Sequence, residues 1–135
     1  MVTFDYHTKI YYKDIDQMGV VYYARYLEYF EQARTELLND MGLIVTKIED
    51  AGYYMPVVKA TANYNEGARF EDEIIVRTRI KELPKARMTI EYEVYRKKDN
   101  QLLVTGQTIH GFINKKDGKP KRAPKFLIEK LNQQI

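Results

Sequence analysis

Two aspartates lie close together just before a long segment with the hydrophobic spacing of a helix. Asp14 and Asp16 are followed by Gly19, and a helix is predicted over residues 20–41. Unpaired N–H groups at the start of a helix, together with the positive end of its dipole, can hold an oxyanion. A carboxylate beside such donors has the parts for acyl transfer: a base or nucleophile and a stabiliser of the tetrahedral oxygen. Spacing alone favours a plainer interpretation, in which Asp14 or Asp16 caps the helix and Gly19 is a turn residue.

Hydrophobic periodicity defines the elements that would hold these aspartates in place. Residues 2–12 alternate between apolar and polar side chains, which predicts a strand with one buried face. Apolar residues at spacings of three and four over 20–41 predict one amphipathic helix of about five turns. From Gly52 onward the period returns to two. Strands are predicted at 53–64, 74–83, 88–94 and 102–113, and a short amphipathic helix is predicted around 126–131.

The short turns between the last four strands favour antiparallel pairing. Together with the first strand and one helix that has a broad apolar face, these four strands predict the α+β class. The expected fold has a long central helix wrapped by a five-stranded antiparallel sheet, and a short C-terminal helix. The length of 135 residues suits a single domain over 1–135. Because one helix covers only one face of such a sheet, the open face and edges favour oligomerisation.

Composition excludes several kinds of protein and of site. Apolar residues make up 44% and charged residues 30% of the chain, which argues against disorder. The lack of cysteine excludes disulfides, thiolate metal sites and a cysteine nucleophile. A formal net charge of +3, with no stripe of Arg and Lys along the helix, argues against nucleic-acid binding. No apolar run suits a membrane span and no secretory signal is apparent, so a soluble cytoplasmic protein is expected.

Tyrosine is the unusual feature of the composition. The chain has 12 Tyr against 5 Phe and no Trp. Half of the tyrosines fall in the segment around the aspartates and the first half of the predicted helix, at Tyr11, Tyr12, Tyr22, Tyr23, Tyr26 and Tyr29. Tyrosine combines apolar bulk with a polar tip, which suits half-buried surfaces. This cluster predicts the wall of a cleft or a subunit contact.

The same segment resembles a known family. The pattern Asp16-x-x-Gly19-x-Val21-x-Tyr23-x-x-Tyr26, followed by the text EYFEQARTELL, is similar to the hot-dog fold thioesterases of the 4-hydroxybenzoyl-CoA thioesterase family. The closest resemblance is to its branch of small bacterial YbgC-like acyl-CoA thioesterases. Similar text continues at Pro56-Val57-Val58, at 64–72 (YNEGARFED), at His110-Gly111-Phe112 and at Gly118-Lys119-Pro120-Lys121, so the resemblance covers nearly the whole chain. The Asp16 motif with the strand order is fairly specific, whereas each later motif alone is weak.

The resemblance implies a hot-dog thioesterase that hydrolyses an acyl-CoA thioester, or an acyl carrier protein thioester, to free acid and thiol. It implies that Asp16 is the catalytic carboxylate, either attacking the thioester carbonyl or activating a water, in a catalytic loop that includes Gly19. It also implies that the backbone N–H of Tyr23 polarises the carbonyl. No metal or organic cofactor is expected. The family's site forms between two subunits, so a homodimer, and further a homotetramer, is expected.

Further residues are expected to bind the substrate. Tyr22, Tyr26 and Tyr64 are expected to line the cleft, and Arg69, inside a family-like stretch, is the best candidate for binding CoA phosphates. Other available cations are more typical of solvated positions: Lys85, Arg87, Lys119, Lys121 and Arg122.

The chain departs from the family's common sequence pattern at three positions. Met18 stands where many relatives have a small residue, Tyr23 where the branch often has His, and Gly67 where Pro is usual. The change at Tyr23 leaves the backbone donor but argues against an acid-base role for the side chain, and it indicates a different acyl preference.

Several alternatives stay open. Other hot-dog enzymes place the carboxylate on the helix, so Glu28 or Glu31 is the fallback, although an ion pair with Arg34 explains Glu31 more simply. His110 is interpreted as a hydrogen-bonded sheet residue, and neither histidine has metal-ligand spacing, so no metal site is expected. A hot-dog dehydratase is disfavoured because the predicted helix contains no His. A non-catalytic acyl-thioester-binding or scaffold module is the non-enzyme alternative.

Overall fold

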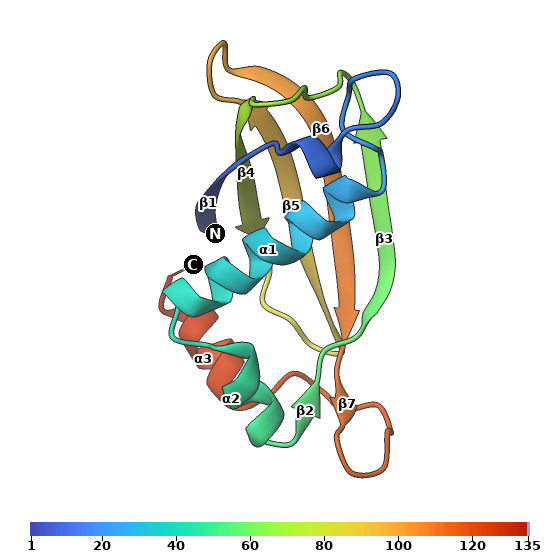
Figure 1. Ribbon diagram of the computed structural model, residues 1–135. Helices are drawn as coiled ribbons and strands as arrows, with labels where there is room; N and C mark the ends of the chain where they lie inside the picture. Colours follow the sequence, from blue (N-terminus) through green and yellow to red (C-terminus); the bar gives the residue numbers. More distant parts are fainter. Residues whose placement is uncertain (135) are drawn as a thin grey trace.

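The long helix and the five-stranded sheet are both present in the computed structural model, which describes residues 1–134. Its elements are β1 (Val2–Lys9), the 3-10 helix η1 (Tyr12–Asp14), α1 (Arg25–Asp40), α2 (Val45–Asp50), β2 (Tyr53–Tyr54), β3 (Val57–Tyr64), β4 (Glu73–Ile80), β5 (Arg87–Arg96), β6 (Gln101–Gly111), β7 (Ile113–Asn114) and α3 (Lys125–Asn132). The five long strands pair antiparallel in the order β1-β4-β5-β6-β3. Figure 1 shows α1 lying across one face of this sheet. The predicted α+β class, central helix and short C-terminal helix are confirmed.

The core lies between α1 and the sheet. Phe30 stacks on Tyr92 of β5 with ring centroids 4.3 Å apart, and Ala33 and Leu37 of the same helix face are fully buried. The Phe30 ring of the helix lies directly against Gly106 of β6, where a Cβ would lie 2.6 Å from the Phe30 ring and 2.6 Å from the Thr61 carbonyl oxygen. A glycine is therefore required at this contact, and it lets α1 seat directly on β6.

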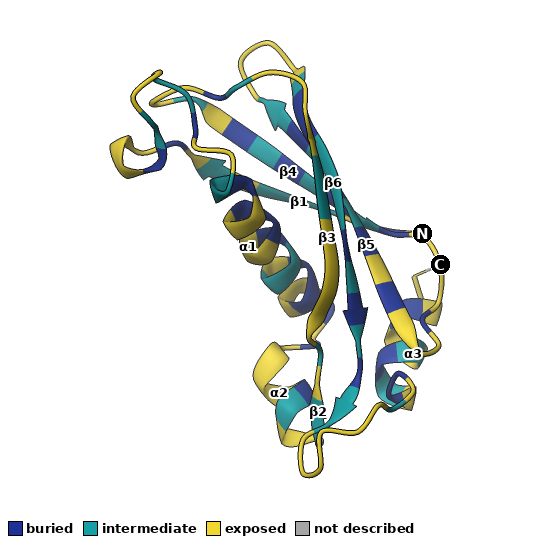
Figure 2. Cartoon of the chain, turned by 90° about the vertical axis from the view of Figure 1, so that its right-hand side faces the viewer, coloured by how far each residue is buried: buried dark blue, intermediate teal, exposed yellow. Residues whose placement is uncertain are grey.

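The strand β3 is an exposed edge of the sheet. Its neighbour is β6, and its other side pairs with no strand of residues 1–134. Val57 and Val58 are 44% and 48% exposed, and Figure 2 shows exposed residues along much of β3. An edge strand presents unpaired N–H and C=O groups that another chain can pair with.

The helix begins later than the periodicity predicts. It starts at Arg25 and not at residue 20. The residues before it make other hydrogen bonds: Val20 and Val21 form β-bridges with Arg69 and Ile15, and the Tyr22 N–H donates to the Asp14 carbonyl at 2.9 Å. The prediction of a helix from residue 20 is thus wrong, because these backbone groups stabilise a hairpin in place of a first helical turn.

Two short features are missing from the sequence-based prediction. The helix α2 lies in a segment for which no element is predicted, and β2 pairs with β7 in a small second sheet. The predicted strand 53–64 is therefore interrupted around Pro56 and serves two sheets. None of the helices within residues 1–134 has the length and apolar character needed to cross a membrane. A single domain over 1–135 stays a prediction.

Candidate active site

The loop before α1 is a tight hairpin that fixes Asp16. The Asp16 N–H donates to the Val20 carbonyl at 2.9 Å, and the Gly19 N–H donates to the Asp16 carbonyl at 3.0 Å. Gly19 has a φ of +81°, which a three-residue hairpin loop requires at its last position and which glycine adopts without strain. The Asp16 Oδ1 accepts a hydrogen bond from the Met18 N–H at 2.8 Å. Asp16 therefore caps this turn and not the helix, and its Oδ2 has no donor among residues 1–134.

Asp14 is buried and stabilises the same loop. It is 3% exposed, and its carboxylate accepts hydrogen bonds from the Tyr11 N–H and the Lys13 ammonium, both at 3.0 Å. Burial acts to raise the pKa of Asp14, but the hydrogen bonds from Lys13 and Tyr11 outweigh it and hold the pKa below its usual value. The Asp14 carbonyl also accepts from the Tyr22 N–H. Asp14 thus has a structural role beside Asp16.

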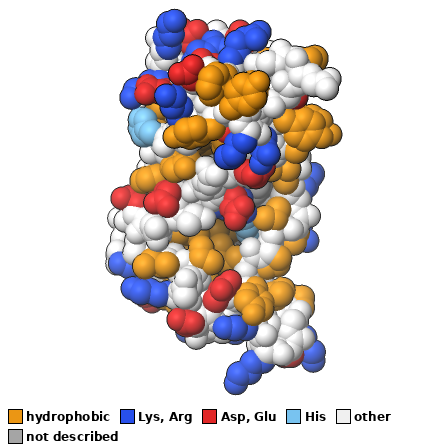
Figure 3. All heavy atoms as spheres, viewed as in Figure 1, with side chains coloured by type: hydrophobic (Ala, Val, Ile, Leu, Met, Phe, Trp, Pro, Cys, Tyr) orange, Lys and Arg blue, Asp and Glu red, His pale blue; other side chains and the backbone are white. Residues whose placement is uncertain are grey.

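A cavity of about 290 Å³ opens beside Asp16. Its walls come from the loop before α1, the first turn of α1 and the loop after β3: Asp16, Met18, Val20, Val21, Tyr23, Tyr26, Tyr64, Asn65, Glu66 and Gly67. Figure 3, in which tyrosine has the same colour as the other hydrophobic side chains, shows side chains of this class exposed over the upper part of the molecule, where these segments lie. Mostly apolar walls with a few polar groups are typical of small-molecule sites. We call this the Asp16 cavity.

Tyr23 lies in the turn that leads into α1. Its carbonyl accepts hydrogen bonds from the Tyr64 hydroxyl at 3.0 Å and from the Tyr26 N–H at 3.4 Å. Its own N–H donates to no acceptor within residues 1–134. The residue is thus held through its carbonyl while its N–H stays available, which is what an oxyanion donor requires.

The predicted tyrosines differ in what they do. Tyr64 lines the Asp16 cavity and is 48% exposed. Tyr26 also lines it but is only 2% exposed, and its hydroxyl accepts a hydrogen bond from the Ala68 N–H at 3.1 Å. Tyr22 packs against the Tyr23 ring with centroids 4.7 Å apart and is not part of the cavity wall. Tyr26 therefore ties α1 to the loop after β3, and Tyr22 supports Tyr23 from outside.

Arg69 lies beside the Asp16 loop. Its backbone pairs with Val20, and its Nη1 lies 3.8 Å from the position that a Cβ on Gly19 would take. The other candidate cations are far from this point. Arg87 pairs with Gly111 at one end of β6, whereas Tyr64 pairs with Val104 towards the other end. The fold thus brings Arg69 to the Asp16 loop within one chain, and leaves Lys85, Arg87, Lys119, Lys121 and Arg122 at the opposite end of the sheet.

The alternative acid and base candidates lie outside the Asp16 cavity. Glu28 pairs with Arg25 at 3.0 Å. Glu31 is exposed, and within residues 1–134 its expected ion pair with Arg34 is not formed. His110 is 2% exposed and hydrogen bonded to Thr108 at 2.8 Å, so its interpretation as a buried sheet residue is confirmed.

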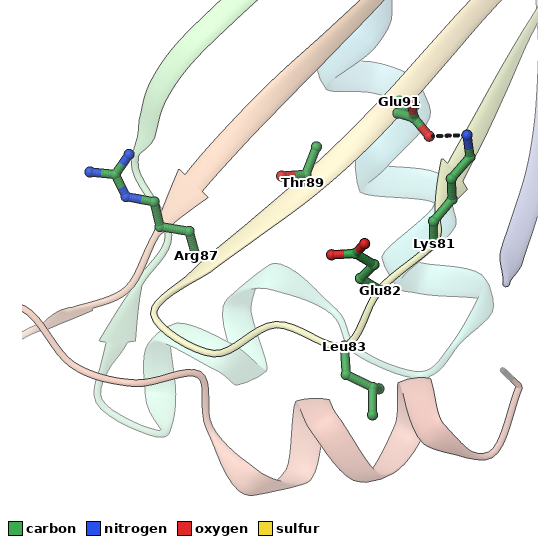
Figure 4. A pocket seen from close by; sticks show the side chains of 6 residues that line it. All are labelled: Lys81, Glu82, Leu83, Arg87, Thr89 and Glu91. Carbon is green, nitrogen blue, oxygen red and sulfur yellow. Dashed lines mark ion pairs between the residues drawn. The ribbon is translucent and has the colours of Figure 1, made fainter.

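A different cavity, of about 220 Å³, lies on the outer face of the sheet at the β4–β5 connection (Figure 4). It is lined by Lys81, Glu82, Leu83, Arg87, Thr89 and Glu91. Lys81 and Glu91 pair with each other at 3.0 Å, so part of its charge is already neutralised. In the described part of the chain, no three His, Cys, Asp or Glu side chains come together as a metal site would need.

Sequence reasoning missed part of the Asp16 cavity wall. Val20, Asn65 and Glu66 line it, together with Met18 and Gly67, which are noted in the sequence only as departures from the family's text. The stretch 64–72 does carry a signal, because it is similar to the family. Its contact with the Asp16 loop becomes visible only through the Val20–Arg69 bridge.

Known proteins similar to this chain were found by both sequence and structure. A family model described as "Thioesterase-like superfamily" matches residues 11–131. The acyl-CoA thioesterase YbgC of Haemophilus influenzae is 34% identical over 107 residues, which cover 78% of this chain and 76% of the relative. The DHNA-CoA thioesterase of Staphylococcus aureus superposes with a TM-score of 0.91 at 25% identity, over 99% of this chain and 91% of that one.

A second solved structure extends the match. A 1,4-dihydroxy-2-naphthoyl-CoA thioesterase from Synechocystis has a TM-score of 0.86 at 27% identity, over 96% of this chain and 98% of that one. The family match over most of the chain and the agreement in fold point to one assignment. The chain belongs to the thioesterase-like superfamily of hot-dog fold proteins and is a thioester hydrolase.

Proposed function

We propose that this protein hydrolyses an acyl-CoA thioester to the free acid and CoA at the Asp16 cavity. The observation that carries the proposal is the pairing of Asp16 with the available N–H of Tyr23 in the wall of one cavity. The names of the relatives, which describe acyl-CoA and arylacyl-CoA thioesterases, support CoA as the thiol carrier. An acyl carrier protein is the alternative carrier.

In the proposed reaction, the Tyr23 N–H binds the thioester carbonyl oxygen and stabilises the negative charge that develops on it. Asp16 uses its unbonded Oδ2 in one of two ways. It removes a proton from a water that attacks the carbonyl carbon, or it attacks that carbon itself and forms an anhydride that water then opens. In both routes the C–S bond breaks and the CoA thiolate leaves. Water is the second substrate, and we propose that no metal or organic cofactor takes part.

Arg69 is proposed to bind a CoA phosphate at the rim of the Asp16 cavity. Its guanidinium lies beside Gly19, and among residues 1–134 no carboxylate lies within ion-pair distance of it. An arginine fork suits a phosphate with two parallel hydrogen bonds. The tyrosines Tyr22, Tyr26 and Tyr64 are proposed to shape the cavity around the acyl group, with Tyr64 in direct contact.

The proposed assembly is a homodimer through the edge strand β3. Val57 and Val58 expose apolar surface there, and the strand's outer hydrogen-bonding groups are free to pair with a second copy. Antiparallel pairing about a two-fold axis would bring the Val57 end of one β3 beside the Tyr64 end of the other. Each Asp16 cavity would then be completed by the partner. A tetramer of two such dimers is the further proposal.

Release of free thiol from a panel of alkyl and aryl acyl-CoA esters tests the activity. Asp16→Asn is expected to lower kcat/KM about a hundredfold or more, since general acid-base groups contribute at this scale. Asp40→Asn, at the far end of α1, is the matched control and should leave kcat/KM unchanged. No turnover with any ester, or full activity in Asp16→Asn, would contradict the proposal. Tight binding without hydrolysis would favour the non-catalytic module.

Further measurements test the role of Asp16, the absence of a metal and the oligomeric state. A single turnover in heavy-oxygen water labels the acid product if water attacks directly, and labels Asp16 if an anhydride is opened at its carboxyl carbon. Treatment with a chelator should leave the rate unchanged. Light scattering should show a dimer or tetramer that Val58→Asp dissociates, because a charge on an exposed edge strand opposes edge-to-edge pairing.

A further inference from the structure

A cavity of about 170 Å³ lies further along α1, away from Asp16. It is enclosed by α1, α2, the segment around β2 and the end of β6: Glu31, Arg34, Thr35, Leu38, Val45, Ile48, Glu49, Tyr53, Met55 and His110. We call it the distal cavity. Its volume is similar to that of cavities that hold a benzene ring, about 150 Å³. The proposed hydrolysis uses none of its residues.

A directed chain of hydrogen bonds lies against the distal cavity. The Met55 carbonyl can only accept, so His110 Nδ1–H donates to it at 3.5 Å and His110 Nε2 is left as an acceptor. The Thr108 hydroxyl then donates to Nε2 at 2.8 Å and accepts from the Tyr92 hydroxyl at 2.7 Å. Burial, with the nearby Arg34 charge, lowers the pKa of His110 to about 4, so the ring is neutral. The chain satisfies its own members, and Arg34 lies beside it, close enough for its charge to act on Tyr92 and His110.

Arg34 is half-buried in the wall of the distal cavity and has no acidic partner. Within residues 1–134 no carboxylate lies at ion-pair distance from its guanidinium. The Tyr92 hydroxyl lies close enough to interact with it, which leaves most of its five N–H donors without a protein acceptor. Glu31 and Glu49 line the same cavity without pairing with it. A partly desolvated guanidinium with free donors is unfavourable unless a ligand supplies an acceptor.

The distal cavity and the Asp16 cavity lie at two ends of one seam between α1 and β3. Leu27 and Arg34 share one face of α1 because they are seven residues apart, and Tyr23 lies in the turn just before this helix. Tyr64 at the end of β3 lines the Asp16 cavity, whereas Met55, just before β3, lines the distal cavity. Leu27, between them on α1, is 42% exposed. The nine residues from Arg25, where α1 begins, to Arg34 correspond to about 14 Å along the helix axis, which an extended acyl chain of medium length can span.

We propose that the distal cavity binds the far end of the acyl chain and that Arg34 selects a chain that ends in a hydroxyl; this rests on the acyl-CoA hydrolysis proposed above. A terminal hydroxyl accepts a hydrogen bond from Arg34 and donates one to Glu31 or Glu49. A terminal carboxylate would pair with Arg34 but would also lie against these two acids, and their repulsion offsets the gain. A plain alkyl end would leave the Arg34 donors unpaired, and sites built for a hydroxyl discriminate strongly against ligands that lack it.

The test compares three series of acyl-CoA esters of increasing length, with methyl, hydroxyl or carboxylate ends. The ratio of kcat/KM for hydroxyl-ended and methyl-ended esters of equal length is expected to exceed about ten at the best length, since the hydrogen bond involves a charged donor. Arg34→Met should lower this ratio about tenfold. Lys47→Met removes an exposed cation of α2 that does not line the cavity, and should leave the ratio unchanged.

Because the ratio is taken within one protein, a smaller folded fraction in Arg34→Met cancels out. An unchanged ratio in Arg34→Met, or a preference for methyl or carboxylate ends in the natural protein, would overturn the distal site while leaving the hydrolysis intact. If no ester is hydrolysed, the proposed activity is wrong. Calorimetric Kd values for the same esters then test the binding role of Arg34 separately. Equal affinities for hydroxyl-ended and methyl-ended esters would then refute the role of Arg34.

Discussion

The hydroxyl of Tyr64 donates a hydrogen bond to the backbone carbonyl of Tyr23 at 3.0 Å. The bond links the end of the edge strand β3 to the turn that carries the proposed oxyanion donor. The Tyr23 and Tyr64 rings also meet edge to face, with centroids 6.3 Å apart. The position of the Tyr23 N–H thus depends on a strand that we propose to be part of a subunit contact. In the proposed dimer, assembly and catalysis would therefore be coupled through this pair of tyrosines.

Replacing Tyr64 by Phe should lower kcat more than it lowers stability. The ring remains, but the Tyr23 carbonyl loses its hydrogen bond, so the N–H is held less precisely. We expect kcat to fall about fivefold, equivalent to about one net hydrogen bond. Because Tyr64 is exposed, the free energy of unfolding should change by less than about 0.5 kcal/mol. Steady-state kinetics and urea unfolding measure both quantities.

Tyr6→Phe is the matched control, because the Tyr6 hydroxyl also makes one exposed hydrogen bond, to Gln32 at 3.0 Å. It should leave kcat unchanged. Equal effects of the two substitutions would argue against a special role for the Tyr64–Tyr23 contact.

Gly19→Ala should impair both stability and turnover. Its φ of +81° is unfavourable for alanine by about 1–2 kcal/mol. Space is not the obstacle, since the nearest atom to an added Cβ is Arg69 Nη1 at 3.8 Å. Strain relief would shift the hairpin that holds Asp16, so kcat/KM should fall about tenfold or more, because catalysis is sensitive to small displacements of reacting groups.

Gly118→Ala gives the comparison for this experiment. Gly118 has a φ of +71° with nothing within 4 Å of an added Cβ, and it lies beyond β7. The stability loss should match that of Gly19→Ala, while kcat/KM stays unchanged. A similar fall in kcat/KM in both variants would mean that Gly19 acts through global stability alone.

Much of the architecture was predictable because it rests on local periodicity. The alternation Met88, Ile90, Tyr92 marks one buried face of β5, and the spacing of Phe30, Ala33 and Leu37 marks the buried face of α1. The start of α1 was not predictable in this way. Apolar residues at 20–24 continue the helical spacing, but the bridges at Val20 and Val21 are long-range contacts that periodicity does not encode.

The site was predictable only in part, for the same reason. The Asp16 motif identifies one loop, and similarity to a family adds Tyr23 and Arg69. The six-residue helix α2 is too short for a helical period to emerge, and β2 and β7 exist through pairing across about 60 residues of chain. The distal cavity depends on both. Arg34 therefore looks like a surface residue in the sequence, and its lack of an acidic partner is visible only in the fold.

Gly106→Ala should destabilise the protein without touching the Asp16 cavity. The added Cβ would lie 2.6 Å from both the Phe30 ring and the Thr61 carbonyl oxygen, so α1 must move away from β6. Overpacking of this kind costs about 1–3 kcal/mol. Gly111→Ala on the same strand is the control: its Cβ would meet Val58 at an ordinary 3.5 Å, and we expect a change within about 0.5 kcal/mol. Equal thermal midpoints for the two variants would contradict the close packing of α1 on β6.

Because His110 is buried, the free energy of unfolding should decrease as the pH falls through a defined window. Its pKa is about 4 in the folded protein against 6.5 for the exposed side chain, so the unfolded state binds more protons between these values. The contribution of His110 is therefore fully present above pH 6.5, is lost progressively as the pH falls to about 4, and amounts to about 3 kcal/mol. The carboxylates with lowered pKa, Asp5, Asp14 and Asp99, titrate from 3.8 downwards and act below this window. Urea unfolding from pH 7.5 to 4.5 measures the slope of the unfolding free energy against pH.

His110→Gln, whose side chain stays neutral, should flatten this slope. His7→Gln, at an exposed position, should leave the slope unchanged. The opposite pattern would show that the buried ring is not the titrating group.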